Sequence, residues 1–375
     1  MPAFINRLCC KCRCCAGHAL WLRDTNNQEK ELMPYLIQQW QAIASNYRGT
    51  LILGNGASIA VSRSFSYQSL LEHARTNELI APDVEQLFAF FGTEDFELIL
   101  RIVWQASNVN RLLQIPDERT HAAYLRVRDC LIESVRAIHP EFDQVSGHLP
   151  SIYQFLKHFD TVASLNYDLI VYWAMMHGRD SDYIHEIKDC FGAGGFFQDN
   201  WFRLRTPIRG RLSTTLVFYP HGSLILCRDM VEQEHKIHSD GGALLEAILD
   251  LWRTETRVPL FVSEGTLEQK VSSIQNSYYL SIVYREVLAS RRDSLVIYGW
   301  GLGEQDLHIL RRMKLSGIRR IAVSVRRGDQ DYCRRVYAII QDVLGPVCVE
   351  FFDRESPGCW NNQNLLHTNV DTDNP

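Results

Sequence analysis

The chain has 375 residues, of which 46% are hydrophobic and 22% are charged, and its formal net charge is −5. This composition is typical of a globular protein with one large domain and an insertion, or with two domains. The negative charge argues against a module that binds nucleic acid through a broad positive field. No stretch approaches the roughly 20 apolar residues of a membrane span, and no secretory signal is evident, so we expect a cytoplasmic protein without membrane contact.

Cysteines crowd the first residues, 1–28, and are otherwise dispersed. The leader holds five of the eleven cysteines, namely Cys9, Cys10, Cys12, Cys14 and Cys15. One interpretation is a soft-metal site, but no second cysteine pair follows at zinc-ribbon spacing, so we expect no metal. The other is a disordered or mis-annotated extension, with translation starting at Met33. The six single cysteines are expected to be reduced core residues.

The opening of the predicted domain, 29–82, alternates helix and strand. Apolar residues recur at helical spacing over 29–47, which predicts one amphipathic helix. A strand over 50–53 runs directly into a glycine-containing turn, and a second helix is predicted over 67–77. Strand, glycine turn and helix in this order are typical of the first unit of a nucleotide-binding sheet.

Long helical patterns fill residues 83–158. Alternating strand and helix patterns follow over 159–355. No strand pattern interrupts the first region, so we expect a helical insertion that forms a subdomain. The second region predicts strands over 161–165, 216–219, 260–263, 294–298, 320–325 and 347–352, separated by helices over 169–176, 273–289, 306–315 and 330–344. We therefore expect an α/β fold with a doubly wound, Rossmann-like, mostly parallel sheet. Residues 356–375 are expected to be a disordered tail.

The first candidate site follows the strand over 50–53. Its glycines would let the backbone approach a ribose or phosphate, and a serine adds a hydroxyl, in the sequence Gly54, Asn55, Gly56, Ala57, Ser58. Ile59 stands where the full dinucleotide fingerprint has a third glycine, and a short glycine pair alone is more often an ordinary tight turn.

The second and third candidate sites also follow strands. Asn166 and Asp168 lie at a strand-to-helix junction, where an amide can bind a ribose hydroxyl, although either residue could simply cap the helix. His221 precedes Gly222 after an apolar strand, and an imidazole there could act as a general base. The alternative is a core histidine held by hydrogen bonds.

The fourth candidate site is a glycine-rich loop after the strand over 294–298. Close backbone contact with a ribose or diphosphate is expected from Gly299, Trp300, Gly301 and Leu302, with Asp306 as a helix cap or as a residue that holds the loop. A plain loop that is rich in glycine for turning is the alternative.

Taken in order, these four motifs resemble the sirtuin-like (silent information regulator type) NAD hydrolases of prokaryotic anti-phage defence, over residues 50–325. Ser263 to Thr266 look like a further marker of an uncharacterised branch. The resemblance implies that Asn166 and His221 form the reaction centre, with Asp168 at the nicotinamide end. It places the first glycine motif, Gly54, Asn55, Gly56 and Ser58, on the ribose and phosphate side, and the loop that begins at Gly299 beside the adenosine half.

Three departures from that family bear on the function. The four-cysteine zinc module of protein-deacetylating sirtuins has no counterpart. The loop with a phenylalanine-arginine pair has no clear match, and Gly301 replaces the usual hydroxyl residue. We expect an NAD glycohydrolase that uses NAD as substrate, acts as a homo-oligomer and works with a defence partner protein. The alternatives are a non-catalytic NAD sensor or assembly module, and, less favoured, a protein deacylase or ADP-ribosyltransferase.

Overall fold

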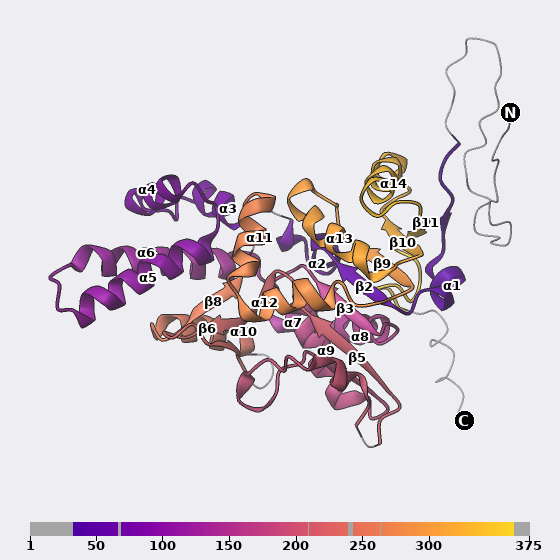
Figure 1. Cartoon of the computed structure of the whole chain (residues 1–375), viewed down its shortest axis with the longest axis horizontal. Coiled ribbons are helices and arrows are strands. Elements are labelled where there is room, and N and C mark those ends of the chain that lie inside the picture. The colour runs from indigo at the N-terminus through magenta and orange to yellow at the C-terminus, as the bar shows by residue number, and fades with distance from the viewer. Residues whose placement is uncertain (1–32, 67–68, 209, 239–242, 263, 364–375) are drawn as a thin grey trace, which may run out of the picture.

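The computed structural model describes residues 33–66, 69–208, 210–238, 243–262 and 264–363. The cysteine-rich leader, Ser263 and most of the expected tail lie outside these residues. The fold is α/β, and its centre is a parallel sheet with helices on both faces, as the sequence predicts (Figure 1).

The main sheet has eight strands in the order β1-β11-β10-β9-β2-β3-β5-β4, and every neighbouring pair is parallel. Its strands are β1 (Ile37–Gln38), β2 (Thr50–Leu53), β3 (Thr161–Ser164), β4 (His185–Lys188), β5 (Ser213–Phe218), β9 (Ser294–Tyr298), β10 (Arg320–Val325) and β11 (Cys348–Asp353). The chain leaves β2 in one direction through β3 and returns at β9 on the other side of β2. Ligands of such sheets bind at this switch point, beyond the carboxyl ends of the strands.

Fourteen α-helices are present among the described residues. They are α1 (Trp40–Ile43), α2 (Asn55–Val61), α3 (Leu70–Thr76), α4 (Pro82–Phe91), α5 (Phe96–Leu112), α6 (Glu118–Ile138), α7 (Phe142–Val145), α8 (Leu149–Leu156), α9 (Ile170–Ser181), α10 (Leu244–Arg253), α11 (Leu267–Gln275), α12 (Tyr278–Ile282), α13 (Leu307–Met313) and α14 (Gln330–Leu344). None is long and apolar enough to cross a bilayer.

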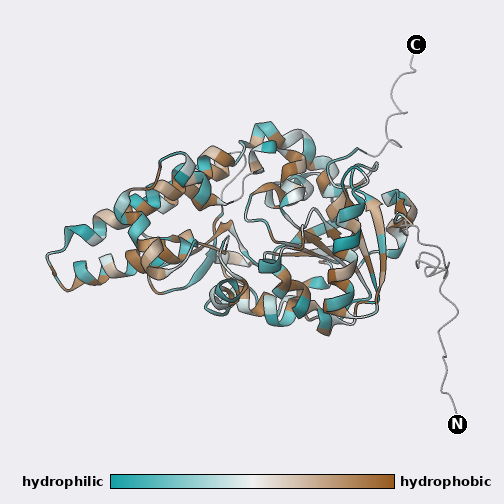
Figure 2. Cartoon of the chain, turned by 90° about the horizontal axis from the view of Figure 1, so that it is seen from above, coloured by the Kyte–Doolittle hydropathy of each residue, from teal (hydrophilic) through white to brown (hydrophobic). Residues whose placement is uncertain are grey.

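Apolar side chains of the strands pack into two hydrophobic cores, one on each face of the sheet. Leu51 and Leu53 enter one core, while Ile52 between them enters the other. Figure 2 shows the strands as largely hydrophobic and the helices as striped, with hydrophilic residues on their outer sides. Alternation along the strand and one apolar stripe on each helix explain why these segments fold as they do.

A second sheet of three strands corrects the expected topology. Its order is β7-β6-β8, with β6 (Gly222–Arg228), β7 (Glu234–Lys236) and β8 (Val258–Phe261) all antiparallel. The segment over 260–263 was expected in the parallel sheet, but its residues Leu260 and Phe261 pair with β6 instead. The strand pattern alone cannot choose a partner, because pairing depends on residues far away in the chain.

The single helix expected over 29–47 is wrong for its described part. Ile37 and Gln38 form β1, which pairs with Phe351 and Phe352 at the edge of the sheet, and only the short helix α1 follows. Tyr35 packs against Phe351 as well. An open strand edge and an apolar surface therefore override the helical spacing of this segment.

The region 83–158 forms helices throughout, as expected. Helices α4, α5 and α6 make an arm that extends away from the main sheet (Figure 1). Helix α8, by contrast, packs closely on α9 beside the main sheet, since a Cβ atom at Gly178 would lie 1.9 Å from the Tyr153 ring. The arm proper is thus α4 to α6.

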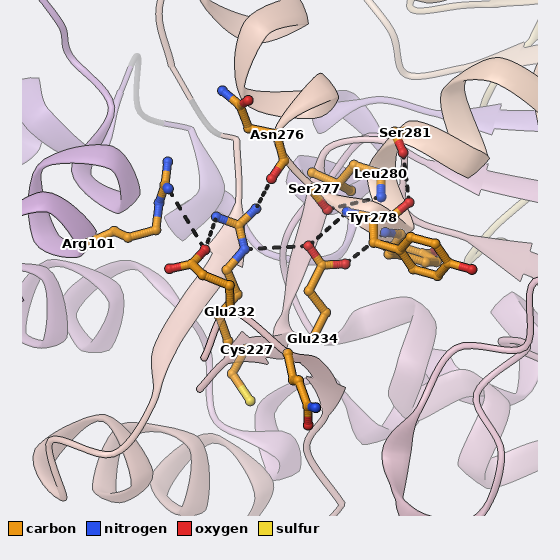
Figure 3. Close-up of polar contacts among 12 residues, drawn as sticks. Arg101, Cys227, Glu232, Glu234, Asn276, Ser277, Tyr278, Leu280 and Ser281 are labelled. Carbon is orange, nitrogen blue, oxygen red and sulfur yellow. Dashed lines mark hydrogen bonds and ion pairs between the residues drawn. The ribbon is translucent and has the colours of Figure 1, made fainter. Parts of the chain in front are cut away.

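A buried ion-pair cluster joins this arm to the rest of the protein. Arg228 of β6 is 2% exposed and lies 3.3 Å from Glu97 of α5 and 3.5 Å from Glu234 of β7. Its guanidinium also donates to the Asn276 carbonyl, and Glu234 accepts the backbone N–H of Tyr279 at 2.7 Å (Figure 3). One cation therefore connects α5, the small sheet and the start of α12.

The prediction of a disordered tail over 356–375 is wrong for its described part, residues 356–363. Ser356, Cys359 and Trp360 are buried, and the Trp360 indole donates a hydrogen bond of 2.9 Å to the Ala57 carbonyl of α2. Asn361 donates to the Ala60 carbonyl of the same helix. This segment reads as polar in sequence, but its few large apolar side chains find a place in the core.

Candidate functional site

The two glycine loops meet each other at the switch point between β2 and β9. Gly56 donates its N–H to the Gly299 carbonyl at 2.7 Å, and Gly54 donates to the Tyr298 carbonyl at 3.0 Å. Gly299 has a φ of +66°, and a Cβ atom there would lie 2.3 Å from the Ala57 nitrogen. The glycines are thus required for the close approach of one loop to the other.

The remainder of the fourth motif is mostly core. Trp300 and Leu302 are buried in the apolar core behind the loop, and the Trp300 carbonyl accepts the Tyr332 hydroxyl hydrogen at 2.8 Å. Gly301 is exposed, and its carbonyl accepts a hydrogen bond from Arg335. Asn55 is exposed as well and donates to the Phe65 carbonyl.

Asn166 lies at the end of β3 and is held by the turn after β2. Its amide nitrogen donates to the Ser58 hydroxyl at 2.8 Å and to the Gly54 carbonyl at 3.1 Å. Both amide hydrogens are therefore used within the protein. The amide oxygen has no hydrogen-bond partner among the described residues, so it can accept a hydrogen from water or from a hydroxyl of a ligand.

Asp168 has two partners. One oxygen accepts the Ser58 hydroxyl hydrogen, and the other accepts the Ile170 N–H at 2.9 Å at the start of α9. Burial raises the pKa of this carboxyl, while both hydrogen bonds oppose the rise. Asp168 therefore caps a helix and also belongs to the Asn166 cluster, which we define as Ser58, Asn166 and Asp168.

His221 is buried and faces a second histidine. Its Nε2 lies 3.1 Å from Nε2 of His308, and the two rings are 4% and 2% exposed. Burial lowers the pKa of His221 to about 3 and that of His308 to about 4, although the Asp306 carboxylate opposes both shifts. Both imidazoles are consequently neutral at neutral pH.

Asp306 and Lys270 complete the histidine cluster, which consists of these two residues with His221 and His308. The Lys270 ammonium donates to the Asp306 carboxylate at 2.8 Å, and both side chains are largely buried. Burial would raise the pKa of Asp306, but His221 and Lys270 outweigh it and lower the pKa. The charges of Lys270 and Asp306 cancel and the two imidazoles are neutral, so this part of the site has no net charge.

Hydrogen bonds connect the segment that follows Asn166 to the segment that follows His221. The Tyr167 carbonyl accepts the Leu224 N–H at 2.8 Å and the Ser223 hydroxyl hydrogen at 3.2 Å. Gly222 has a φ of +76°, and a Cβ atom there would lie 2.2 Å from the Leu260 carbonyl. The space beside this glycine is thus taken by β8. The predicted residues Asn166 and His221 come from neighbouring segments of one edge.

A cleft of about 720 Å³ lies beside the histidine cluster, between helices α3 and α4 and the segment after β8. Its walls include the polar residues Arg75, Glu85, Glu264, Lys270 and Gln305. Glu264 is 8% exposed and accepts the backbone N–H groups of Leu70 and Leu71, and burial raises its pKa to about 8. None of the sequence-predicted catalytic residues lines this cleft, but Lys270 and Gln305 connect it to Asp306 and His308.

Sequence reasoning missed His308 and Lys270 as members of the site. His308 comes two residues after Asp306, and Lys270 comes after the marker that ends at Thr266, yet neither follows a strand directly. Each reaches the site from a helix, α13 or α11, so only helical phase could have pointed to it. Within the described residues, no group of three or more His, Cys, Asp or Glu side chains could hold a metal ion.

Comparison with known families gives a match over most of the chain. Residues 51–360 match the family described as "Domain of unknown function (DUF4917)". The chain belongs to the DUF4917 family. The matched range of this DUF4917 protein includes all four motifs and ends at Trp360, the last large residue that packs on α2. No curated protein matches the chain significantly.

Two solved structures are similar to the DUF4917 chain at low identity. One, titled "Structural Basis for the Mechanism and Regulation of Sir2 Enzymes", is 8% identical with a TM-score of 0.32, and the match covers 81% of this chain and 97% of that one. The other, a Sir2 homologue mutant in complex with ADP-ribose, is 13% identical with a TM-score of 0.30, over 80% and 95% of the two chains. At this similarity, function has to be argued from the residues of the DUF4917 chain itself.

Proposed function

We propose that the protein hydrolyses NAD⁺ at the nicotinamide glycosidic bond and releases nicotinamide and ADP-ribose. The observation that carries the proposal is that the segments holding Asn166 and His221 adjoin at one edge of the sheet, where the Tyr167 carbonyl accepts hydrogens from Ser223 and Leu224. An amide acceptor and an imidazole on adjoining segments suit the activation of water. The switch point beside them is where sheets of this kind bind nucleotides.

Asn166 supplies the fixed acceptor. Because its two amide hydrogens bind Gly54 and Ser58, the amide oxygen is held in one orientation. That oxygen would accept a hydrogen from the attacking water or from a ribose hydroxyl. Ser58 and Asp168 act behind it, since their hydrogen bonds fix the rotamer of Asn166 without contact to the substrate.

His221 supplies the base. The nicotinamide leaves with the electron pair of the C–N bond, and the ribose passes through an oxocarbenium-like state. The water oxygen then forms the new bond to the ribose carbon, while one water proton moves to the neutral imidazole of His221. Nicotinamide is released as a neutral molecule, so the reaction needs no general acid, and it generates one proton.

A non-catalytic NAD sensor is the second candidate function. Burial of His221 favours it over the third candidate, which is protein deacylation or ADP-ribosyl transfer. A histidine that is 4% exposed and bonded to a neighbour can be a core residue. A sensor would still use the Asn166 cluster to bind the nucleotide. Protein deacylation or ADP-ribosyl transfer is less well supported, because the cysteines after His221 lack the four-cysteine arrangement of protein deacylases.

The cellular role that we propose is that of a cytoplasmic effector which depletes NAD during anti-phage defence. The support is the motif order Gly54, Asn166, His221 and Gly299, which resembles that of defence NAD hydrolases. Homo-oligomerisation and a defence partner that controls the activity belong to the same proposal. The α4 to α6 arm is the segment that we assign to such contacts.

The test is direct incubation of the purified protein with NAD⁺, followed by chromatographic separation of nicotinamide, ADP-ribose and cyclic ADP-ribose. We expect His221→Ala and Asn166→Ala each to reduce cleavage by about 10² to 10⁴-fold. His158→Gln serves as the matched control, because His158 is a half-buried histidine bonded to the Ala44 carbonyl, away from the site.

The melting temperature of the same preparations separates the alternatives. A catalytic His221 predicts lost turnover in a protein that still folds. A core histidine predicts a lower melting temperature with unchanged turnover per folded molecule. Binding of NAD⁺ by calorimetry without any cleavage would leave the sensor as the better function.

A further inference from the structure

The cleft of about 720 Å³ beside the histidine cluster has no role in the proposed reaction so far. The segment after β8 connects the two, because Val262 donates its N–H to the His221 carbonyl at 2.7 Å and Glu264, which lines the cleft, follows two residues later. Lys270 lines the cleft as well and donates to Asp306 of the histidine cluster. A group that leaves the reaction centre therefore has open space next to it.

The cationic side chains in the cleft wall are paired with carboxylates. Arg75 lies 2.6 Å from Glu85, and the Lys270 ammonium lies 2.8 Å from Asp306. Phe88 of α4 adds a buried aromatic ring to the wall. Walls of this kind suit an uncharged ligand that has an apolar face and a few polar groups, because they offer no free cation to an anionic one.

Glu264 presents a hydrogen-bond donor to this cleft. Burial, together with the carboxylates of Asp95 and Glu94, raises the pKa of Glu264 to about 8, so the carboxyl is mostly protonated at neutral pH. The Leu70 N–H donates to Oε1, and the Leu71 N–H lies 3.4 Å from both oxygens, so the acid hydrogen belongs on Oε2. Among the residues that the structure describes, no hydrogen bond engages this hydrogen. It is therefore available to a ligand.

We propose that the cleft receives the nicotinamide group of NAD⁺, and that Glu264 donates its carboxyl hydrogen to the carboxamide oxygen of this leaving group. The inference rests on the proposed NAD hydrolysis for the identity of the ligand, and on the cleft and the contacts of Glu264 for the donor. Nicotinamide is a flat ring with one uncharged amide, which matches an aromatic wall and a neutral donor. Asp168, which the family resemblance places at the nicotinamide end, already has one oxygen bonded to Ser58 and the other to Ile170.

A neutral acid in this position favours bond cleavage, whereas a carboxylate opposes it. When the C–N bond breaks, its electron pair moves to the ring nitrogen, and the pyridinium becomes an uncharged pyridine. The carboxamide oxygen then carries more electron density, so the Glu264 donor stabilises the transition state more than the substrate. An ionised Glu264 would instead attract the pyridinium and stabilise the substrate. Glu264 keeps its proton throughout, and the water proton goes to His221.

The variants Glu264→Leu and Glu264→Gln separate the donor from the charge. Leucine removes the donor, whereas the glutamine amide can donate to the carboxamide oxygen and does not titrate. We expect kcat for NAD⁺ cleavage at pH 7 to fall about 10-fold in Glu264→Leu and to return in large part in Glu264→Gln. Glu118→Leu, at the exposed start of α6, controls for the loss of a carboxyl elsewhere, and melting temperatures are measured for all variants.

The pH dependence of kcat tests the protonated form of Glu264. The charged groups that act on it are Arg75, Glu94 and Asp95, and Lys270 lines the same cleft. Burial raises the pKa of Asp95 to about 6, so Asp95 titrates below the range of interest. Between pH 7 and pH 9 the wild-type kcat should fall as Glu264 loses its proton. Glu264→Gln should not show this fall.

Calorimetric binding of nicotinamide gives a readout that does not need activity. If the acid form alone binds, a pKa of about 8 makes the apparent Kd of the wild-type protein about 10-fold weaker at pH 9 than at pH 7. Glu264→Leu should weaken binding at pH 7 by about 10-fold, and Glu264→Gln should bind equally at both pH values. Ala89→Trp, which fills the cleft from α4, should also weaken binding. Phe90→Trp is its matched control, because Phe90 is 81% exposed and does not belong to the cleft wall.

Failure of the two proposals can be told apart. If the wild-type protein does not cleave NAD⁺ but binds nicotinamide through Glu264, the hydrolase function is lost and the carboxamide site stands. If cleavage occurs, and neither kcat nor nicotinamide binding responds to Glu264→Leu, the carboxamide site is wrong although the hydrolase function stands. Absence of nicotinamide binding to the wild-type protein also overturns the site. Should Glu264→Leu fail to fold, equal pH dependence of the wild-type protein and Glu264→Gln overturns it.

Discussion

Ser58 donates its hydroxyl hydrogen to Asp168, which lies 110 residues later in the chain. The same hydroxyl oxygen accepts the amide hydrogen of Asn166. One side chain from α2 thus holds both polar residues that follow β3. This contact ties the first turn of the sheet to the start of α9.

Ser58→Ala should lower the free energy of unfolding by about 1–3 kcal/mol, because it leaves a buried oxygen of Asp168 without its donor. Asp168→Asn should cost about 1 kcal/mol or less, since asparagine also caps helices. The double variant should cost less than the sum, because the two residues share one contact. Urea denaturation measures all three, with Ser146→Ala as control, because this variant removes only an exposed hydrogen bond to the Asp143 carbonyl. Strict additivity would show that the contact contributes nothing.

Glu264→Gln should change how stability depends on pH. Burial raises the pKa of Glu264 from 4.5 to about 8, so the folded protein binds this proton more tightly than the unfolded chain does. The wild-type protein therefore loses stability as pH rises from about 5 to 8 through this group. Glutamine keeps an acceptor for the Leu70 N–H but does not titrate.

The measurement for Glu264 is the melting temperature of both proteins between pH 5 and 8.5. We expect the melting temperature of Glu264→Gln to increase relative to that of the wild-type protein as pH rises. The exposed Glu118→Gln is the matched control, and its difference from the wild-type protein should stay constant. Parallel curves for Glu264→Gln and the wild-type protein would show that this carboxyl has an ordinary pKa.

Trp360→Ala should destabilise the fold by about 3–5 kcal/mol, because the side chain is 1% exposed and packs on α2. Trp360→Phe should cost less, since it keeps most of the apolar contact and loses only the hydrogen bond to the Ala57 carbonyl. Chemical denaturation gives both values. Tyr183→Ala, at a side chain that is 75% exposed, should change stability little. Equal effects at residues 360 and 183 would mean that the end of the domain does not belong to the core.

Arg228→Met should cost about 3–5 kcal/mol, because it leaves Glu234 buried without its cation and leaves Glu97 with Arg101 alone. Adding Glu97→Gln to Arg228→Met should recover part of this loss. Arg136→Met breaks an exposed pair with Glu246 and should cost about 0–1 kcal/mol. Urea denaturation of the four proteins tests this. If both arginine variants cost the same, the cluster does not hold the arm to the small sheet.

Local pattern was sufficient for much of the main sheet. β2 and β9 lie where alternating or continuous apolar runs predict them, and α14 has the predicted bounds. These segments are predictable because one face or both faces of each must be buried wherever it packs. The same logic placed Asn166 and the glycine loops at the carboxyl edge, since parallel strands end at one side of a sheet.

Long-range contacts decided the rest. β8 became part of the small sheet because β6 offered it an antiparallel edge, and Trp360 joined the core because α2 left room for it. His308 faces His221 through the phase of α13, although the two are 87 residues apart. Sequence carries no local signal for such pairs, because each depends on how two distant backbones approach, and that is settled only when the whole core packs.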